Sequence, residues 1–368
     1  MSHYCDESTS DIISISNLRT EPTNRPVAMN TRLVTETDRS EWDSFVSKAK
    51  AGTFFHLFAW KDIMEQVFGH KTWFLVAEQD SKIRGVLPLA EIKSRLFGHS
   101  LISLPFCAYG GAIGGVAAVR ALEVHANEIA ITRGVQYAEF RNLSPLHEDW
   151  PRQDLYATFR KQILDDDEAN LQAVPRKQRA MIRKGAKNAL HAKVGSTVDD
   201  FFDLYARNVK RHGTPALPKS YFAALKNTFG DDCEVLTVTT SDGLPISSVL
   251  TFYFKSEVLP YYAGDEVMAR RLAANDFKYW QLMCRARERG CTLFDFGRSK
   301  MGTGQYSFKK NWGFTPTTLS YEFRLYKRDS VPQNNPLNPK YRALISIWRR
   351  LPLRLANALG PRIVKNLG

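Results

Sequence analysis

One order of secondary-structure signals occurs twice in the 368-residue sequence, and this repeat restricts the fold more than any other feature. In each half, an amphipathic helix ending in Phe-Gly is followed by two strands joined by a polar turn. A second helix then stops at Arg-Gly, and a closing strand carries an acidic residue six positions after the arginine. The paired landmarks are Phe68-Gly69 and Phe229-Gly230, Arg133-Gly134 and Arg289-Gly290, and Glu139 and Asp295.

The repeat predicts an α/β fold made of two tandem units, each with helices around an antiparallel hairpin in a mixed sheet. We expect a disordered leader over residues 1–30, a first unit over 31–165 and a second unit over 170–328. Residues 329–368 then form a proline-rich linker and a basic amphipathic tail. The alternative is that these landmarks recur by coincidence in an ordinary α/β chain.

The composition is typical of a folded protein in a reducing compartment. Hydrophobic residues make up 43% of the chain, which is enough to build cores for two units. The five cysteines are scattered, and no His/Cys cluster has the spacing of a zinc site, so we expect free thiols and no metal. Neither a signal peptide nor a membrane-spanning run is present, which predicts a cytoplasmic location.

The net charge of +13 is concentrated in two segments that contain no acidic residue. Residues 174–193 hold seven basic side chains, and residues 337–368 hold seven more. On a helix, Arg176, Arg179 and Arg183 fall on one face, where like charges repel unless an anion binds. We therefore expect these arginines to bind an anionic substrate or donor; the alternative is a solvated charged face.

The tail over residues 340–368 places Leu, Ile and Trp among arginines. Such a pattern is typical of a helix that lies on an anionic membrane surface, at the periphery of its inner face. It is also compatible with a helix that packs its apolar side on the body of the protein.

The second repeat ends in LFDFGRSKMGTGQYSFKKNWGF (residues 293–314), a glycine-rich loop after a buried strand. Loops at this end of a strand carry ligands in open α/β sheets. Asp295 is a candidate general base or the ion-pair partner of Arg298, and we favour the ion pair. The predicted catalytic residues are Asp295, Arg298, Ser299, Tyr306 and Lys309, and the predicted binding residues are Gly302, Gly304, Lys310 and Trp312. For Trp312, packing in the core is an equal alternative.

The first half has a comparable loop, SLPFCAYGGAIGG (residues 103–115). Its small residues predict close approach of the backbone to a ligand in a cleft between the units. Tyr109, Gly110 and Gly111 are therefore candidate binding residues, with an ordinary connecting loop as the alternative.

The sequences VPRKQRAMIRKG and FDFGRSKMGTGQYSFKKNWGF, together with the paired helix–hairpin units, resemble the FemAB-type acyltransferases, which are doubled GNAT-like proteins. The ending LPLRLANALGPRIVKNLG is similar to the branch associated with PEP-CTERM/exosortase gene clusters. The resemblance implies two GNAT-like domains and acyl or aminoacyl transfer to an amine or hydroxyl of a cell-envelope or exopolysaccharide precursor.

The same resemblance implies no tightly bound cofactor and an acyl-CoA or aminoacyl-tRNA co-substrate. Residues 197–293 lack the coiled-coil insertion found in some family members, which weighs against transfer RNA. Two alternatives stay open. One is a non-catalytic GNAT-fold factor that binds an anionic glycan intermediate at the membrane. The other is a nucleic-acid binder, although the 174–193 segment lacks aromatic residues for base stacking, and we expect no DNA partner.

Overall fold

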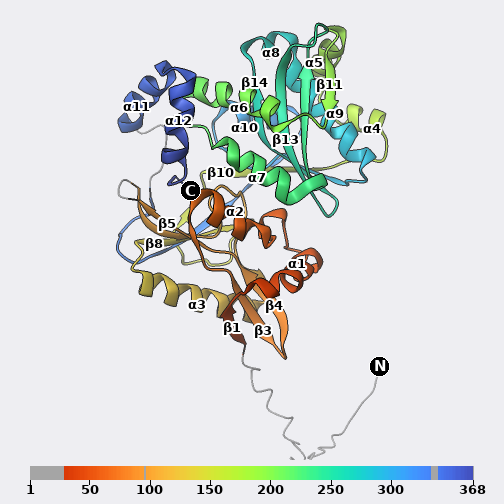
Figure 1. The fold of residues 1–368 in the computed structure, drawn as a ribbon. Coiled ribbons are helices and arrows are strands. Elements are labelled where there is room, and N and C mark those ends of the chain that lie inside the picture. Colours follow the sequence, from red (N-terminus) through yellow and green to blue (C-terminus); the bar gives the residue numbers. More distant parts are fainter. Residues whose placement is uncertain (1–28, 95–96, 333–338, 368) are drawn as a thin grey trace, which may run out of the picture.

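Each half of the chain folds into a mixed α/β unit, as the computed structural model of residues 29–94, 97–332 and 339–367 shows (Figure 1). Most of the predicted leader (1–28) and residues 333–338 of the predicted linker lie outside the described residues. The first unit contains β1 (Asn30–Leu33), η1 (Glu36–Asp38), α1 (Arg39–Lys48), η2 (Phe54–His56), α2 (Ala59–Phe68), β2 (Lys71–Thr72), β3 (Leu75–Gln79), β4 (Lys82–Leu87), β5 (Ala90–Ser94), β6 (Gly98–Ile102), β7 (Ile113–Gly114), α3 (Val116–Arg133), β8 (Tyr137–Asn142) and β9 (Arg152–Gln153).

The second half repeats this order with longer strands. It contains β10 (Tyr156–Gln162), α4 (Asp167–Gln172), α5 (Arg176–Lys187), β11 (His191–Val194), α6 (Val198–His212), α7 (Lys219–Phe229), η3 (Gly230–Asp232), β12 (Cys233–Thr239), β13 (Pro245–Phe254), β14 (Glu257–Asp265), α8 (Val267–Leu272), α9 (Ala274–Glu288), β15 (Leu293–Asp295), β16 (Ser299–Lys300), α10 (Gly304–Asn311), β17 (Pro316–Thr318) and β18 (Ser320–Leu325). The tail forms α11 (Pro339–Arg350) and α12 (Leu353–Val364).

The repeat predicted from the sequence is present in the fold. The hairpin β3–β4 corresponds to β12–β13, and the closing strands β8 and β15 each run parallel to a strand of their own unit, β6 and β14 respectively. Both helices that precede the closing strands are followed by a glycine with positive φ, at Gly134 (φ 66°) and Gly290 (φ 75°). Only glycine adopts this conformation without a steric penalty, so the Arg-Gly stops have a clear structural reason.

The two units exchange one strand each. β10 precedes residue 165 in the sequence, yet it pairs with β15 in the sheet of the second unit, where Arg160 lies opposite Asp295. In return, β18 from the end of the second half pairs with β8 in the sheet of the first unit. The sequence boundaries 31–165 and 170–328 therefore divide the chain, whereas two of the three sheets, the one that β10 joins and the one that β18 joins, take strands from both segments.

A single aromatic core joins the two units. Helices α2 and α7, which both end in Phe-Gly, pack against each other. The ring of Phe54 stacks on Phe252 with centroids 4.3 Å apart, and it also lies 4.5 Å from Phe229. Because such buried rings contribute large apolar areas, this core couples the stability of the two units.

The tail packs on the body along α6, next to the junction of the units (Figure 1). Trp348 and Ala356 are buried, and Gly360 lies against the backbone of Ala216. Beyond the helix, the carbonyl oxygen of Lys365 is 2.8 Å from Nε2 of His70 in the first unit. Among the described residues, no helix combines the length and the low charge needed to cross a bilayer.

We predict that Phe54→Ala destabilises the whole protein in one step. The substitution removes a fully buried ring that contacts both units, so the free energy of unfolding should fall by about 3–5 kcal/mol. Urea unfolding followed by tryptophan fluorescence and far-ultraviolet circular dichroism should give one coincident transition. Val116→Ala, at a residue that is 71% exposed, serves as the control with little change. Two separate transitions, with only one shifted, would contradict a shared core.

Candidate active site at the junction of the units

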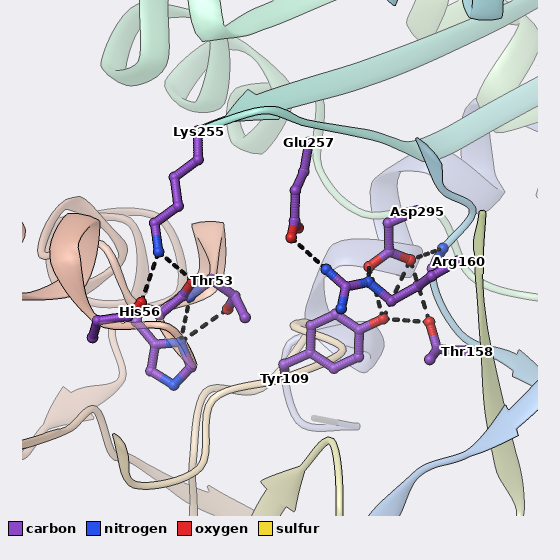
Figure 2. Close-up of polar contacts among 11 residues, drawn as sticks. Thr53, His56, Tyr109, Thr158, Arg160, Lys255, Glu257 and Asp295 are labelled. Atoms are coloured by element: carbon purple, nitrogen blue, oxygen red, sulfur yellow. Dashed lines mark hydrogen bonds and ion pairs between the residues drawn. The ribbon is translucent and has the colours of Figure 1, made fainter. Parts of the chain in front are cut away.

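Asp295 lies at the carboxyl end of β15 and is the centre of a buried polar network (Figure 2). Its side chain is 1% exposed. The backbone N–H of Gly297 donates to Oδ1 at 2.7 Å, Thr158 Oγ1 donates to Oδ1 at 3.2 Å, and Tyr109 Oη donates to Oδ2 at 3.0 Å. Burial raises the pKa of the Asp295 carboxyl.

The ion-pair partner of Asp295 is Arg160, and the predicted pair with Arg298 does not form. Arg160 Nε is 3.2 Å from Asp295 Oδ2, and the same guanidinium also bonds Glu257 (Figure 2). The reason lies in the strand exchange, which sets Arg160 directly opposite Asp295 in the ladder. Arg298 follows the turn at Gly297 (φ 65°), and its guanidinium bonds the hydroxyl of Tyr321 instead.

These contacts assign Asp295 a positioning role. Both carboxyl oxygens already accept hydrogen bonds or face Arg160, and the side chain has almost no exposed surface. A general base must reach the proton that it removes, so Asp295 cannot act on a substrate in this arrangement. It instead fixes the start of the loop that follows β15.

Arg298 is a deeply placed cation. Its Nη1 donates to Tyr321 Oη at 2.9 Å, and the guanidinium lies 4.9 Å from the ring centroid of Tyr156. Tyr321 in turn donates to the carbonyl oxygen of Ala108 at 2.8 Å. Within the described ranges, Arg298 forms no ion pair with a carboxylate. A half-buried guanidinium without a counter-charge is suited to bind an anionic group of a ligand.

Lys309 lies on α10 and closes the loop from the other side. Its Nζ donates to the carbonyl oxygens of Phe296 at 2.6 Å, Gly297 at 3.0 Å and Arg298 at 3.3 Å. Burial lowers the pKa of Lys309 to about 7, against the attraction of Asp295. Lys309 therefore titrates close to neutral pH and also holds the loop that carries Arg298.

The other predicted residues of this loop lie close by. Ser299 is buried on β16, and its Oγ has no hydrogen-bond partner among the residues that the structure describes. Tyr306 is half-buried with its ring edge against Phe159. Gly302 and Gly304 are exposed at the start of α10, where a Cβ would meet no neighbour, and Lys310 is exposed on the same helix.

Trp312 does not belong to the site, which corrects its prediction as a binding residue. The side chain is fully buried among the aromatic residues of the second core. Its Nε1 donates to Asp276 Oδ1 at 2.9 Å, so the polar atom is also occupied. Trp312 is therefore a core residue, which is the alternative that the sequence left open for it.

Of the first-unit loop, only Tyr109 reaches the network. The N–H groups of Gly110 and Gly111 both donate to the carbonyl oxygen of Arg141 at 3.1 Å, so neither amide faces a ligand. Gly111 is required for packing, because a Cβ there would overlap the side chain of Asn142. Its carbonyl oxygen lies 2.9 Å from Nε2 of His56, whose pKa is lowered to about 4 by burial, so this imidazole is neutral.

The basic helix α5 begins next to the site and then leads away from it. A Cβ on Gly313, just after α10, would lie 3.1 Å from Pro175. Arg176, Arg179 and Arg183 are on the outer side of α5, whereas Ile182 is buried. None of the three arginines forms an ion pair with a described carboxylate, although Arg179 donates to Gln172.

Several residues that complete the site carry no signal in the local sequence pattern. Thr158 and Arg160 on β10, Glu257 on β14 and Tyr321 on β18 come from strands that are distant in sequence from the loop. The sequence ATFRKQIL (residues 157–164) predicts a strand, but no local signal shows which sheet this strand joins. Within the described ranges, no group of three or more His, Cys, Asp or Glu side chains could hold a metal ion.

With this geometry in view, residues 176–310 match the family model described as an acetyltransferase (GNAT) domain. The chain has a tandem GNAT fold, with one such unit in each half and the basic amphipathic tail after the second. No curated protein sequence matches the chain.

Solved structures share this fold over most of the chain. The crystal structure of FemX has a TM-score of 0.63 at 17% identity, covering 81% of this chain and 98% of that one. The C-terminal domain of a putative lysylphosphatidylglycerol synthetase from Agrobacterium fabrum has a TM-score of 0.55 at 15% identity, covering 78% and 91%. A tandem GNAT protein from the clavulanic acid biosynthesis pathway has a TM-score of 0.51 at 13% identity, covering 80% and 97%.

We predict that Asp295→Ala lowers both stability and activity. The substitution removes the acceptor of the buried Gly297 N–H, Thr158 and Tyr109 donors, so the free energy of unfolding should fall by about 1–3 kcal/mol. Chemical denaturation measures this loss. The control is Asp203→Ala, which removes an exposed carboxylate and should change stability by at most about 0.5 kcal/mol. A stable variant without activity would show instead that Asp295 contacts the substrate.

Proposed function

We propose that the protein is an acyltransferase of the FemAB-related kind. It transfers an acyl, acetyl or aminoacyl group to an amine or hydroxyl of a cell-envelope or exopolysaccharide precursor, in a PEP-CTERM protein-sorting context. The observation that carries the proposal is the pair of cations at the end of the GNAT-matching segment, Arg298 on the loop after β15 and Lys309 on α10, whose side chain bonds that loop. The shared fold of FemX and of the lysylphosphatidylglycerol synthetase domain also supports envelope-directed transfer.

The donor is an activated acyl carrier, either an acyl-CoA or an aminoacyl-tRNA. Both carriers are polyanions, which suits the unneutralised Arg298 and the arginines on α5. In the reaction, the acceptor nitrogen or oxygen forms a bond to the carbonyl carbon of the donor. The bond from that carbon to the sulfur or oxygen of the carrier breaks, and the proton of the acceptor passes to the departing carrier.

The residues of the chain contribute by position and charge. Arg298 binds an anionic group of a substrate, and its orientation is fixed by Tyr321 and by the stacking with Tyr156. The Lys309 ammonium supplies positive charge beside the loop where negative charge develops on the carbonyl oxygen. Asp295 keeps the loop in place, and the proton of the acceptor leaves with the carrier because this carboxylate is inaccessible.

One observation favours a second candidate, a non-catalytic factor that binds an anionic glycan intermediate. The acid at the end of β15 has both oxygens occupied, so the loop offers cations without an accessible carboxylate base. Tight binding of a precursor without turnover of any donor would favour this candidate over transfer.

We predict that Arg298→Ala and Lys309→Ala each reduce transfer by about 100-fold or more while the fold is kept, because the first removes the cation that binds an anionic substrate group and the second removes the positive charge that holds the loop carrying it. Transfer should be measured with acyl-CoA thioesters and with aminoacyl-tRNA on the same preparation. Lys310→Ala, which removes an exposed lysine from the same helix, is the matched control and should leave activity within a few-fold. Normal activity in both site variants would exclude this loop as the active site.

We predict that transfer declines as the pH rises through about 7, since the ammonium form of Lys309 is lost there. Lys309→Arg should retain its charge and extend activity to higher pH. The pH dependence of the free energy of unfolding gives an independent check of this pKa. An unfolded lysine titrates near 10.5, so between about 7 and 10.5 the unfolded state holds the extra proton. As the pH rises through that window, the free energy of unfolding of the wild type should increase relative to that of Lys309→Met. The absence of this increase would contradict the lowered pKa of Lys309.

A further inference from the structure

Helix α12 has apolar residues on two faces. One face packs on the body through Ala356 and Gly360. The other carries Leu355, Leu359 and Ile363, which are 45%, 36% and 36% exposed. At four-residue spacing, these three side chains form one row along the helix. The packed face therefore does not explain why the sequence places large apolar residues on the outer face.

Basic residues border this row. Arg354, Arg362 and Lys365 are exposed on α12 or just after it, and Arg349 and Arg350 are exposed at the end of α11. The described tail, residues 339–367, contains no acidic residue. None of these five side chains forms an ion pair with a described carboxylate. The outer surface of the tail thus combines an apolar row with unneutralised positive charge.

A pocket continues the basic surface beyond the end of α12. It has a volume of about 210 Å³, and Lys365 and Asn366 line it together with Lys71 and Lys93 of the first unit. The only carboxylate in its lining, Glu91, is bonded by Arg133 and His99. Positive charge therefore extends from the tail onto the first unit, and the one carboxylate in the pocket lining is already bonded to basic side chains.

We propose that the outer face of α12 docks onto an anionic phospholipid bilayer. The Leu355, Leu359 and Ile363 side chains enter the boundary between headgroups and acyl chains, and the neighbouring arginines contact lipid phosphates. A protein groove would need acidic residues to match these cations, whereas an anionic bilayer supplies negative charge and an apolar layer together. Because the inner face of α12 already packs on the body, the helix is ordered before it binds. This docking is independent of the transfer chemistry proposed above.

The test is sedimentation of the full chain with vesicles of phosphatidylcholine alone and with vesicles that also contain phosphatidylglycerol. We expect binding to the phosphatidylglycerol vesicles that weakens with added salt, and little binding to phosphatidylcholine. The double variant Leu355→Ser, Leu359→Ser should lose affinity by about 10-fold or more. Arg354→Gln with Arg362→Gln should lose about 10-fold and depend less on salt. Absence of wild-type binding to phosphatidylglycerol vesicles would overturn the proposal.

A matched control removes exposed apolar residues elsewhere. Val124→Ser with Ile131→Ser changes two residues of α3 that are 60% and 62% exposed, and it should bind vesicles as the wild type does. If Val124→Ser with Ile131→Ser lost as much affinity for the vesicles as Leu355→Ser with Leu359→Ser, the specific role of α12 would be overturned. Sedimentation without lipid measures the oligomeric state. If the wild type were a dimer and the variant Leu355→Ser, Leu359→Ser a monomer, a second copy of the chain, and not a bilayer, would cover this face. Transfer to a water-soluble acceptor should be unchanged in the α12 variants, which separates a failure of docking from a failure of the proposed function.

Discussion

The antiparallel pairing of β10 with β15 is the contact on which the candidate site depends. It places Arg160 opposite Asp295, so the acid at the end of β15 is neutralised by a residue from before the second unit begins. With its carboxylate held in this way, Asp295 accepts the N–H of Gly297 and sets the turn from which Arg298 follows. The return exchange of β18 brings Tyr321, which bonds Arg298. Neither half of the chain could build this arrangement alone, because each provides the strand that completes the other.

The distribution of charge around the site follows from the same pairing. Two acids, the buried Asp295 and the half-buried Glu257, share the single guanidinium of Arg160, and desolvation raises the pKa of both carboxyls. Both carboxyl groups of the network thus pair with Arg160, and neither is left to neutralise Arg298. Lys309 bonds only backbone carbonyl oxygens, so its charge is also uncompensated by a direct carboxylate contact. The loop after β15 consequently presents the positive charge of Arg298 to a ligand, whereas the network behind it holds two carboxyl groups and one guanidinium.

The features that the sequence could predict are those encoded by local patterns. The two hairpins, the helices that stop at Gly134 and Gly290, and the amphipathic tail all follow from spacing over a few residues, and the fold has them. The exchange of strands could not be predicted, because ATFRKQIL reads as a strand without showing which sheet it joins. For the same reason Arg298 was expected to pair with Asp295, its neighbour in sequence, whereas the true partner Arg160 lies far away along the chain. Trp312 was ambiguous, since an aromatic residue next to a cationic loop fits both a core and a binding surface.

The tail contacts both units and exposes its outer row of apolar residues. Through α6 it packs on the second unit, and through the contact between Lys365 and His70 it reaches the first unit. Because the tail contacts both units, its packing on α6 and the contact with His70 set the direction of its outer row. A surface attached to that row would therefore have a defined orientation relative to Arg298 and Lys309.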